Sequence, residues 1–281
     1  MITIGLTTWS DHPAFSNDDR PPSLTTYASF LPTVEVDTPF YAIPKVSTVI
    51  NWQRQVPKQF QFVLKANQLM TQHDLRGPKP ATLHERHQAF QQFQKMVVPL
   101  VDRHQLKTIL FQFPPFFDLT NEHLDYLTQI RNYLPDLPIT VEFRHPAWFN
   151  KQFESQLFSG LQQLGMTLAI VDEPHNLNDG VPFVPVITNP NLVFIRLHGR
   201  NAAGWFNQGK DWRSKRTLYR YNDHELQGLA GIVKDLANQA REVCVIFNNN
   251  SGKDAAPNAL KLQSLLGLHF KGLAPKQLDL F

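Results

Sequence analysis

The sequence predicts a single (β/α)8 TIM-type barrel of the α/β class, and three observations lead to this expectation. The chain has 281 residues, a length that such barrels routinely reach as one domain. Hydrophobic residues make up 42% of it, enough for a large core, and the charged fraction of 18% is too low for global disorder. Eight short apolar runs alternate with longer amphipathic stretches, as they do in parallel βαβ units.

The eight runs predicted as strands are rich in β-branched and aromatic residues. They are Ile2–Thr7, Thr33–Asp37, Gln61–Lys65, Thr108–Gln112, Ile139–Arg144, Thr167–Val171, Val193–His198 and Val243–Asn248. Five intervening segments have helical periodicity: Leu83–His104, Thr120–Leu134, Gln152–Leu164, Asp223–Ala240 and Ala256–Leu266.

Local signals support several of these helices. Thr120 is an N-cap residue with Glu122 in the first turn, and Gly165 stands where a helix would end. Pro174–Asn191 holds four prolines and no helical period, so the sixth helix of the barrel is expected to be short or irregular. We place the barrel at residues 1–272 and a C-terminal tail at 273–281.

The composition also bears on location. The N-terminus has no signal-peptide pattern, and no apolar run approaches the roughly 18 residues that span a bilayer. The one cysteine, Cys244, lies in an apolar strand and has no intrachain partner for a disulfide. These features predict a cytoplasmic protein without a membrane partner.

Charge is unevenly distributed along the chain. The net charge is +3, but residues 196–221 contain seven basic residues against one acidic residue. That segment therefore carries +6 and the rest of the chain −3, which favours an anionic partner.

Polar residues collect at the predicted C-terminal ends of seven strands, the face where barrel enzymes have their active sites. Residues two apart on a barrel strand share a side, so these groups should point inward. They form what we call the bowl: Glu35, Asp37, Lys65, Gln112, Glu142, Arg144, Asp172, Arg196, His198 and Asn248. The alternative is that they neutralise one another as buried salt bridges, as Glu142 beside Arg144 suggests.

Several motifs together resemble the YecE-like family of unknown function, in order along the chain. They are residues 34–41 (VEVDTPFY), 111–115 (FQFPP), 141–145 (VEFRH) with Trp148, 171–174 (VDEP), 195–199 (IRLHG), and 247–249 (FNN) with Asn258. The resemblance implies a barrel loosely similar to the xylose isomerase and endonuclease IV superfamily, and it implies no activity. The family often has Gly-Thr-Ser-Gly-Trp where this chain has Gly5-Leu-Thr-Thr-Trp9, which casts doubt on a tight backbone approach to a ligand there.

The leading hypothesis is a hydrolase for a phosphate-bearing substrate such as nucleic acid or a phosphorylated small molecule. Arg144 and Arg196 would grip an anion, because guanidinium groups bind phosphate bidentately, and Lys65 and His198 would add charge. Asn248, Tyr41 and Trp148 complete the predicted binding set. The predicted catalytic residues are Glu142, Asp172 and His198, with Glu142 or Asp172 as the base.

Aromatic residues interleave with the basic ones after the seventh predicted strand: Trp205, Phe206, Trp212, Tyr219 and Tyr221. This pattern is typical of segments that stack on nucleobases and bind phosphates, and it is equally compatible with a solvated basic loop. The carboxylates of the bowl also permit a glycosidase- or isomerase-like sugar enzyme. No cofactor and no metal ligand set are predicted, since only His198 is well placed, although a divalent metal stays open.

The chain ends in Gln277, Leu278, Asp279, Leu280 and Phe281. This pentapeptide matches the segment with which bacterial replication and repair proteins dock on the DNA sliding clamp. Leu280 and Phe281 would be apolar anchors and Gln277 would give polar specificity. Two alternatives stay open: a tail packed on its own barrel, and a non-catalytic clamp-associated scaffold whose bowl is structural.

Overall fold

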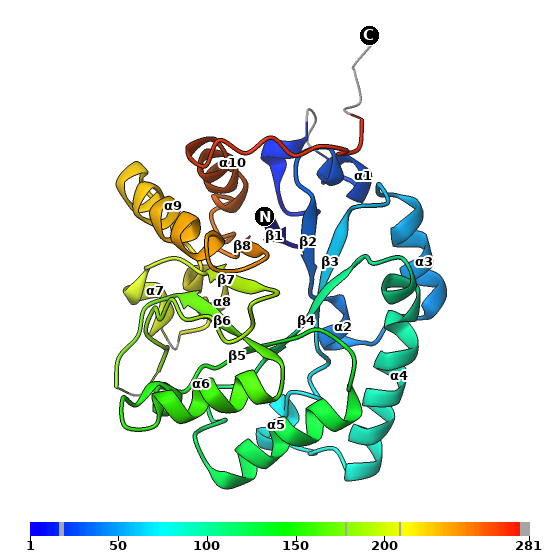
Figure 1. Cartoon of the computed structure of the whole chain (residues 1–281), viewed down its shortest axis with the longest axis vertical. Helices are drawn as coiled ribbons and strands as arrows, with labels where there is room; N and C mark the ends of the chain where they lie inside the picture. The colour runs from blue at the N-terminus through cyan, green and yellow to red at the C-terminus, as the bar shows by residue number, and fades with distance from the viewer. Residues whose placement is uncertain (17–19, 178, 208, 276–281) are drawn as a thin grey trace.

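Eight parallel strands close into a barrel in the computed structural model, which describes residues 1–16, 20–177, 179–207 and 209–275. The strands follow one another around the barrel in sequence order, and β8 pairs with β1 to close it. Figure 1 shows the strands in the centre and the helices around them. The predicted (β/α)8 fold is confirmed.

The strands agree with their predicted positions to within two residues. They are β1 (Ile2–Thr7), β2 (Thr33–Val36), β3 (Gln61–Lys65), β4 (Leu106–Gln112), β5 (Ile139–Glu142), β6 (Met166–Asp172), β7 (Val193–Leu197) and β8 (Val243–Phe247). Several strands end earlier than predicted, so Asp37, Arg144, His198 and Asn248 lie one or two residues past a strand.

The five predicted helices are present, with bounds shifted by one to three residues. They are α4 (Leu83–Asp102), α5 (Asn121–Tyr133), α6 (Glu154–Gln163), α9 (Asp223–Ala237) and α10 (Ala255–Leu265). Thr120 caps α5 by accepting a hydrogen bond from the His123 N–H, as predicted. Gly165 has a φ of 61° just past α6.

The further helices, four, five or nine residues long, are not among those predicted from the sequence. They are α1 (Leu24–Ala28), α2 (Thr38–Tyr41), α3 (Val46–Arg54), α7 (Ala202–Trp205) and α8 (Trp212–Arg216), with 3-10 turns at Pro13–Phe15, His73–Arg76 and Pro146–Phe149. Between β6 and β7 the described residues contain no helix, in line with the four prolines there.

The barrel interior is a separate apolar cluster that fixes which residues face inward. It contains Val63, Leu110, Ala169, Val171, Phe194, Cys244 and Ile246 from five strands. Side chains alternate along a strand, so the residue two positions beyond each of these also faces the interior. Polar side chains therefore enter the lumen at its C-terminal end.

Thr8 follows β1 with a φ of 60°, in the left-handed region that costs a β-branched residue about 1–2 kcal/mol. It stands at the second glycine of the pattern that the YecE-like family often has. The backbone therefore keeps a glycine-type conformation after the glycine has been lost.

The last described residues pack on the barrel. The Ala274 N–H, one residue past the predicted start of the tail, donates to the Ala28 carbonyl. The clamp-binding prediction for Gln277–Phe281 concerns residues outside the described part of the chain. No helix in the described part is long and apolar enough to cross a membrane.

Candidate functional site

The centre of the bowl is Arg196, which is 2% exposed and paired with two buried glutamates. Its Nε and Nη2 atoms donate to the two carboxylate oxygens of Glu35 at 2.9 and 2.6 Å. Its Nη1 donates to Glu142 Oε2 at 3.1 Å. All the guanidinium nitrogens are thus used by the protein itself, so Arg196 is not placed to hold an external anion as the sequence suggested.

Arg144 extends this network to a third glutamate. Its Nη2 lies 2.8 Å from Glu142 Oε1 and its Nη1 lies 2.8 Å from Glu173 Oε2. Gln112 Nε2 also donates to Glu142 Oε1 at 2.7 Å. Both terminal nitrogens of Arg144 are therefore occupied by protein carboxylates, so Arg144 is not placed to bind a ligand bidentately as the sequence suggested. Its Nε has no partner among the described residues.

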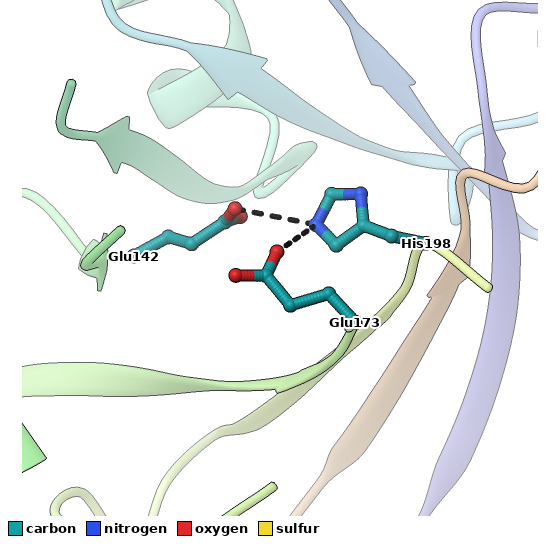
Figure 2. A group of neighbouring side chains, drawn as sticks. All are labelled: Glu142, Glu173 and His198. Atoms are coloured by element: carbon teal, nitrogen blue, oxygen red, sulfur yellow. Dashed lines mark hydrogen bonds and ion pairs between the residues drawn. The ribbon is translucent and has the colours of Figure 1, made fainter. Parts of the chain in front are cut away.

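Glu142, Glu173 and His198 converge from β5, the segment after β6 and the end of β7 (Figure 2). One ligand atom from each lies within 4.8 Å of the other two, which is a spacing that a metal ion would accept. Arg144 already contacts all three: both carboxylates, and His198 Nε2 at 3.3 Å. A cation thus fills the position, and a divalent ion would bind only if Arg144 moved away.

His198 is fully buried and lies among cationic donors. Its Nε2 is 3.2 Å from Arg196 Nη1 and 3.3 Å from Arg144 Nη2, and its Nδ1 is 2.7 Å from the Asn248 side-chain amide. Burial lowers the pKa of His198 well below its usual value, and both arginines lower it further. A neutral ring whose Nε2 accepts from the arginines fits this arrangement.

The environments of Glu142 and Glu173 push their pKa values apart. Burial raises the pKa of Glu142, but Arg196 and Arg144 outweigh it and hold it well below its usual range. Burial raises the pKa of Glu173 to about 8, with Arg144 only partly opposing it. At neutral pH, Glu142 is therefore an anion and Glu173 carries a proton.

A pocket of about 540 Å³ opens above this cluster. It is lined by Asn176, Asp179, Trp205, Phe206, Asn207, Trp212 and Arg216. Trp205 lies between the pocket and the cluster, with its ring 5.7 Å from that of His198 and the Arg144 guanidinium 5.1 Å away. Its indole N–H is buried without a hydrogen-bond partner in the described part of the chain, so a ligand oxygen could accept from it.

Arg216 is the basic side chain of this pocket. Its guanidinium lies 3.9 Å from the centre of the Trp205 ring, and no described carboxylate is within ion-pair distance of it. Burial and Arg144 lower the pKa of Arg216 to about 10, which leaves it charged at neutral pH. Other basic residues of the segment are paired with acids: Arg200 with Asp172, and Arg220 with Asp254.

A larger pocket of about 720 Å³ lies at the opposite end of the barrel, around Lys107, Arg131 and Glu242. Lys107 is paired there with Glu242, and Arg131 donates to backbone carbonyls. These contacts stabilise the N-terminal end of the barrel. Barrel enzymes have their active sites at the C-terminal face, so this pocket is not the candidate site.

Three predicted site residues lie away from the cluster. Asp172 faces outward, where the Tyr221 hydroxyl donates to it at 2.7 Å and Arg200 at 3.0 Å. Trp148 is fully buried, stacks on Phe143 and donates its indole N–H to a backbone carbonyl. Tyr41 is 72% exposed on α2.

Sequence reasoning missed Glu173, although the alternation on β6 contains the signal. Ala169 and Val171 belong to the interior cluster, so the next inward residue is Glu173 and Asp172 points to the opposite side. Arg216 and Trp205 were recognised only as parts of a basic, aromatic segment. Their short helices gave no period from which to orient them.

Comparison with known proteins agrees with this architecture. The model of the family described as "Protein of unknown function DUF72" matches residues 3–279. UPF0759 protein YunF of Bacillus subtilis (strain 168) is 39% identical over the whole of both chains. UPF0759 protein YecE of Escherichia coli (strain K12) is 30% identical over 69% of this chain and 74% of its own.

Crystal structures of relatives have the same fold. A DUF72 family protein from Enterococcus faecalis V583 superposes with a TM-score of 0.91 at 41% identity, over 99% of this chain and all of the other. One from Thermotoga maritima MSB8 gives 0.79 at 26% identity, over 95% of this chain and all of the other. The chain therefore belongs to the DUF72 family of barrel proteins, and the UPF0759 proteins YunF and YecE are its relatives.

Proposed function

We propose that this protein is a hydrolase that acts by general acid catalysis on a phosphate-bearing substrate bound at the C-terminal face of the barrel. The observation that carries the proposal is the Glu142–Glu173 pair, two buried carboxyl groups that share Arg144 and whose surroundings shift their pKa values in opposite directions. Pairs whose environments separate their pKa values in this way are typical of acid–base sites.

The two glutamates would take different roles. Water forms a bond to phosphorus as the ester bond breaks, and Glu173 gives its proton to the oxygen of the leaving group. The proton that the water loses passes to the phosphate product and from there back to Glu173. Glu142, an anion of low basicity, orients the attacking water instead of abstracting its proton. Phosphoryl transfer requires little proton abstraction from the nucleophile, so a weak base suffices.

Arg216, Trp205 and Trp212 would bind the substrate. Arg216 supplies a positive charge for a phosphate, and the two indole rings supply flat surfaces for a base or sugar. Trp205 is only 3% exposed, so the stack of Trp205 and Arg216 has to open before a substrate reaches Glu173. The phosphate site is thus proposed at Arg216 instead of Arg144 and Arg196.

Hydrolysis of p-nitrophenyl phosphate and bis(p-nitrophenyl) phosphate tests this proposal. We expect turnover that is lost in Glu173→Gln and Glu142→Gln, with Arg216→Gln raising KM and leaving kcat closer to that of the parent. Arg220→Gln, on the exposed rim, is the matched control. If the folded protein neither hydrolyses either ester nor binds phosphate, the proposed hydrolase function is wrong and the buried network has a structural role only.

A sugar substrate is the second candidate, favoured by the separation of the two glutamates. One carboxyl oxygen of each lies within 4.8 Å of the other, and retaining glycosidases likewise hold their two carboxyl groups close together. Glu173 would then be the acid and Glu142 the nucleophile. Cleavage of uncharged p-nitrophenyl glycosides, unaffected by Arg216→Gln, would select this candidate over the first.

The C-terminal pentapeptide supports a proposed partner, the DNA sliding clamp. Ala274 is the last described residue with a backbone hydrogen bond to the barrel, and the motif begins three residues later. Titration of a sliding clamp with the full chain and with a version ending at Lys276 tests it. We expect binding by the full chain alone; equal binding by both, or none, would exclude this docking.

A further inference from the structure

Lys65 is a buried amine that the proposed hydrolysis does not use. It is the last residue of β3, two positions beyond the interior residue Val63, so its side chain enters the bowl. The side chain is 13% exposed, so it is not completely closed off from solvent. Barrel enzymes position catalytic groups at such strand ends.

The surroundings of Lys65 hold the amine only loosely. Its nearest acid is Asp37, whose Oδ1 lies 3.9 Å from Nζ, beyond hydrogen-bond distance. That oxygen has no hydrogen-bond partner in the described residues. On another side, the ring of Phe40 lies 4.6 Å from Nζ. Arg196, by contrast, is held by two carboxylates with short contacts.

The charges around Lys65 are mixed. Burial lowers its pKa, and nearby Arg196 lowers it further, whereas Asp37, Glu35 and Glu142 raise it. His73 also lies near, and burial followed by Lys65 lowers its pKa to about 4, so it adds no charge at neutral pH. The net lowering increases the fraction of neutral amine, the nucleophilic form.

We propose that Lys65 is a nucleophile that forms a Schiff base with an aldehyde or ketone bound in the bowl. The neutral Nζ attacks the carbonyl carbon, and the first of its two protons moves to the carbonyl oxygen to give a carbinolamine. Asp37 accepts the proton that nitrogen loses and returns it to the departing hydroxyl, which leaves as water. A C=N bond replaces the C=O bond, and no oxidant or reductant takes part.

Reductive trapping tests the proposal on the full chain. Glycolaldehyde is the probe, and sodium cyanoborohydride converts any imine at pH 7 into a stable secondary amine that peptide mass spectrometry locates. Lys95 on α4 and Lys234 on α9, both exposed, are internal controls. We expect Lys65 to react faster than both exposed lysines, because the lowering of its pKa enlarges the neutral fraction of the amine.

Two variants separate nucleophilic reactivity from simple access. Asp37→Asn removes the proposed proton acceptor and should slow trapping at Lys65, even though loss of the negative charge enlarges the neutral fraction of the amine; Lys95 and Lys234 should be unchanged. Lys65→Arg keeps the positive charge and should abolish the fast adduct. Trapping at Lys65 no faster than at the exposed lysines would overturn the proposal. Glu173→Gln should not change trapping, so this result and that of the hydrolysis assay are distinguishable.

Discussion

Removal of Arg196 should destabilise the barrel strongly, because it would leave two buried carboxylates without their main partner. Glu35 and Glu142 are fully buried, and Arg196 donates to both. Loss of one member of a buried ion pair costs about 3–5 kcal/mol. For Arg196→Met we expect that loss in the free energy of unfolding, or a Tm lower by about 6–20 °C for a chain of this size.

Urea denaturation of matched variants measures this effect. The control is Lys261→Met, whose side chain is 44% exposed and lies 2.9 Å from Asp223, which is itself 71% exposed. An exposed pair contributes about 0–1 kcal/mol, so the control should stay near the parent. The Arg196→Met loss should be smaller at pH 5 than at pH 8, because Glu35 can then take up a proton. A loss below about 1 kcal/mol at pH 8 would refute the buried network.

Three further predictions concern single residues. The pKa of Glu173 in the folded protein lies near 8, above its value in the unfolded chain. The stability that this carboxyl contributes is therefore lost as pH rises from about 4.5 to 8. In Glu173→Gln, the urea midpoint should change less with pH across this range. Thr8→Gly should raise stability by about 0.5–1 kcal/mol in thermal melts, since relief of about 1–2 kcal/mol of left-handed strain exceeds the entropy cost of glycine. A lower melting temperature would contradict the presence of backbone strain at Thr8. Gly199→Ala should lower stability by more than about 2 kcal/mol, because φ is 93° and the new Cβ would lie 2.4 Å from the Cβ of Tyr219. The control Gly160→Ala, on α6, should be neutral or stabilising. Equal melting temperatures for the two variants would contradict this prediction.

The barrel could be predicted because its signals are local. Apolar runs mark the strands, and alternation along each strand marks the inward side, which is why Glu142, Arg196 and His198 were all assigned to one bowl. The pairing of these groups depends on distances across the barrel. Arg196 and Glu35 are 161 positions apart, and no pattern in the sequence reports that they meet at 2.6 Å.

The site was harder to predict than the fold for a second reason. Asp172 and Glu173 are neighbours of the same chemistry, and only the phase of β6 decides that Glu173 enters the lumen. Trp148 lies near predicted site residues in sequence, but a 3-10 turn carries it into an aromatic stack. Side-chain direction after a strand ends is set by tertiary packing.

Titration of the Glu173 carboxyl tests the central claim most directly. In protein labelled with 13C at the glutamate side-chain carboxyl carbon, the resonance missing from Glu173→Gln identifies this group. The account predicts a midpoint near pH 8 for it, while the resonance missing from Glu142→Gln stays that of a carboxylate down to pH 4. A Glu173 midpoint near the ordinary value of about 4.3 would contradict the assignment of Glu173 as the acid.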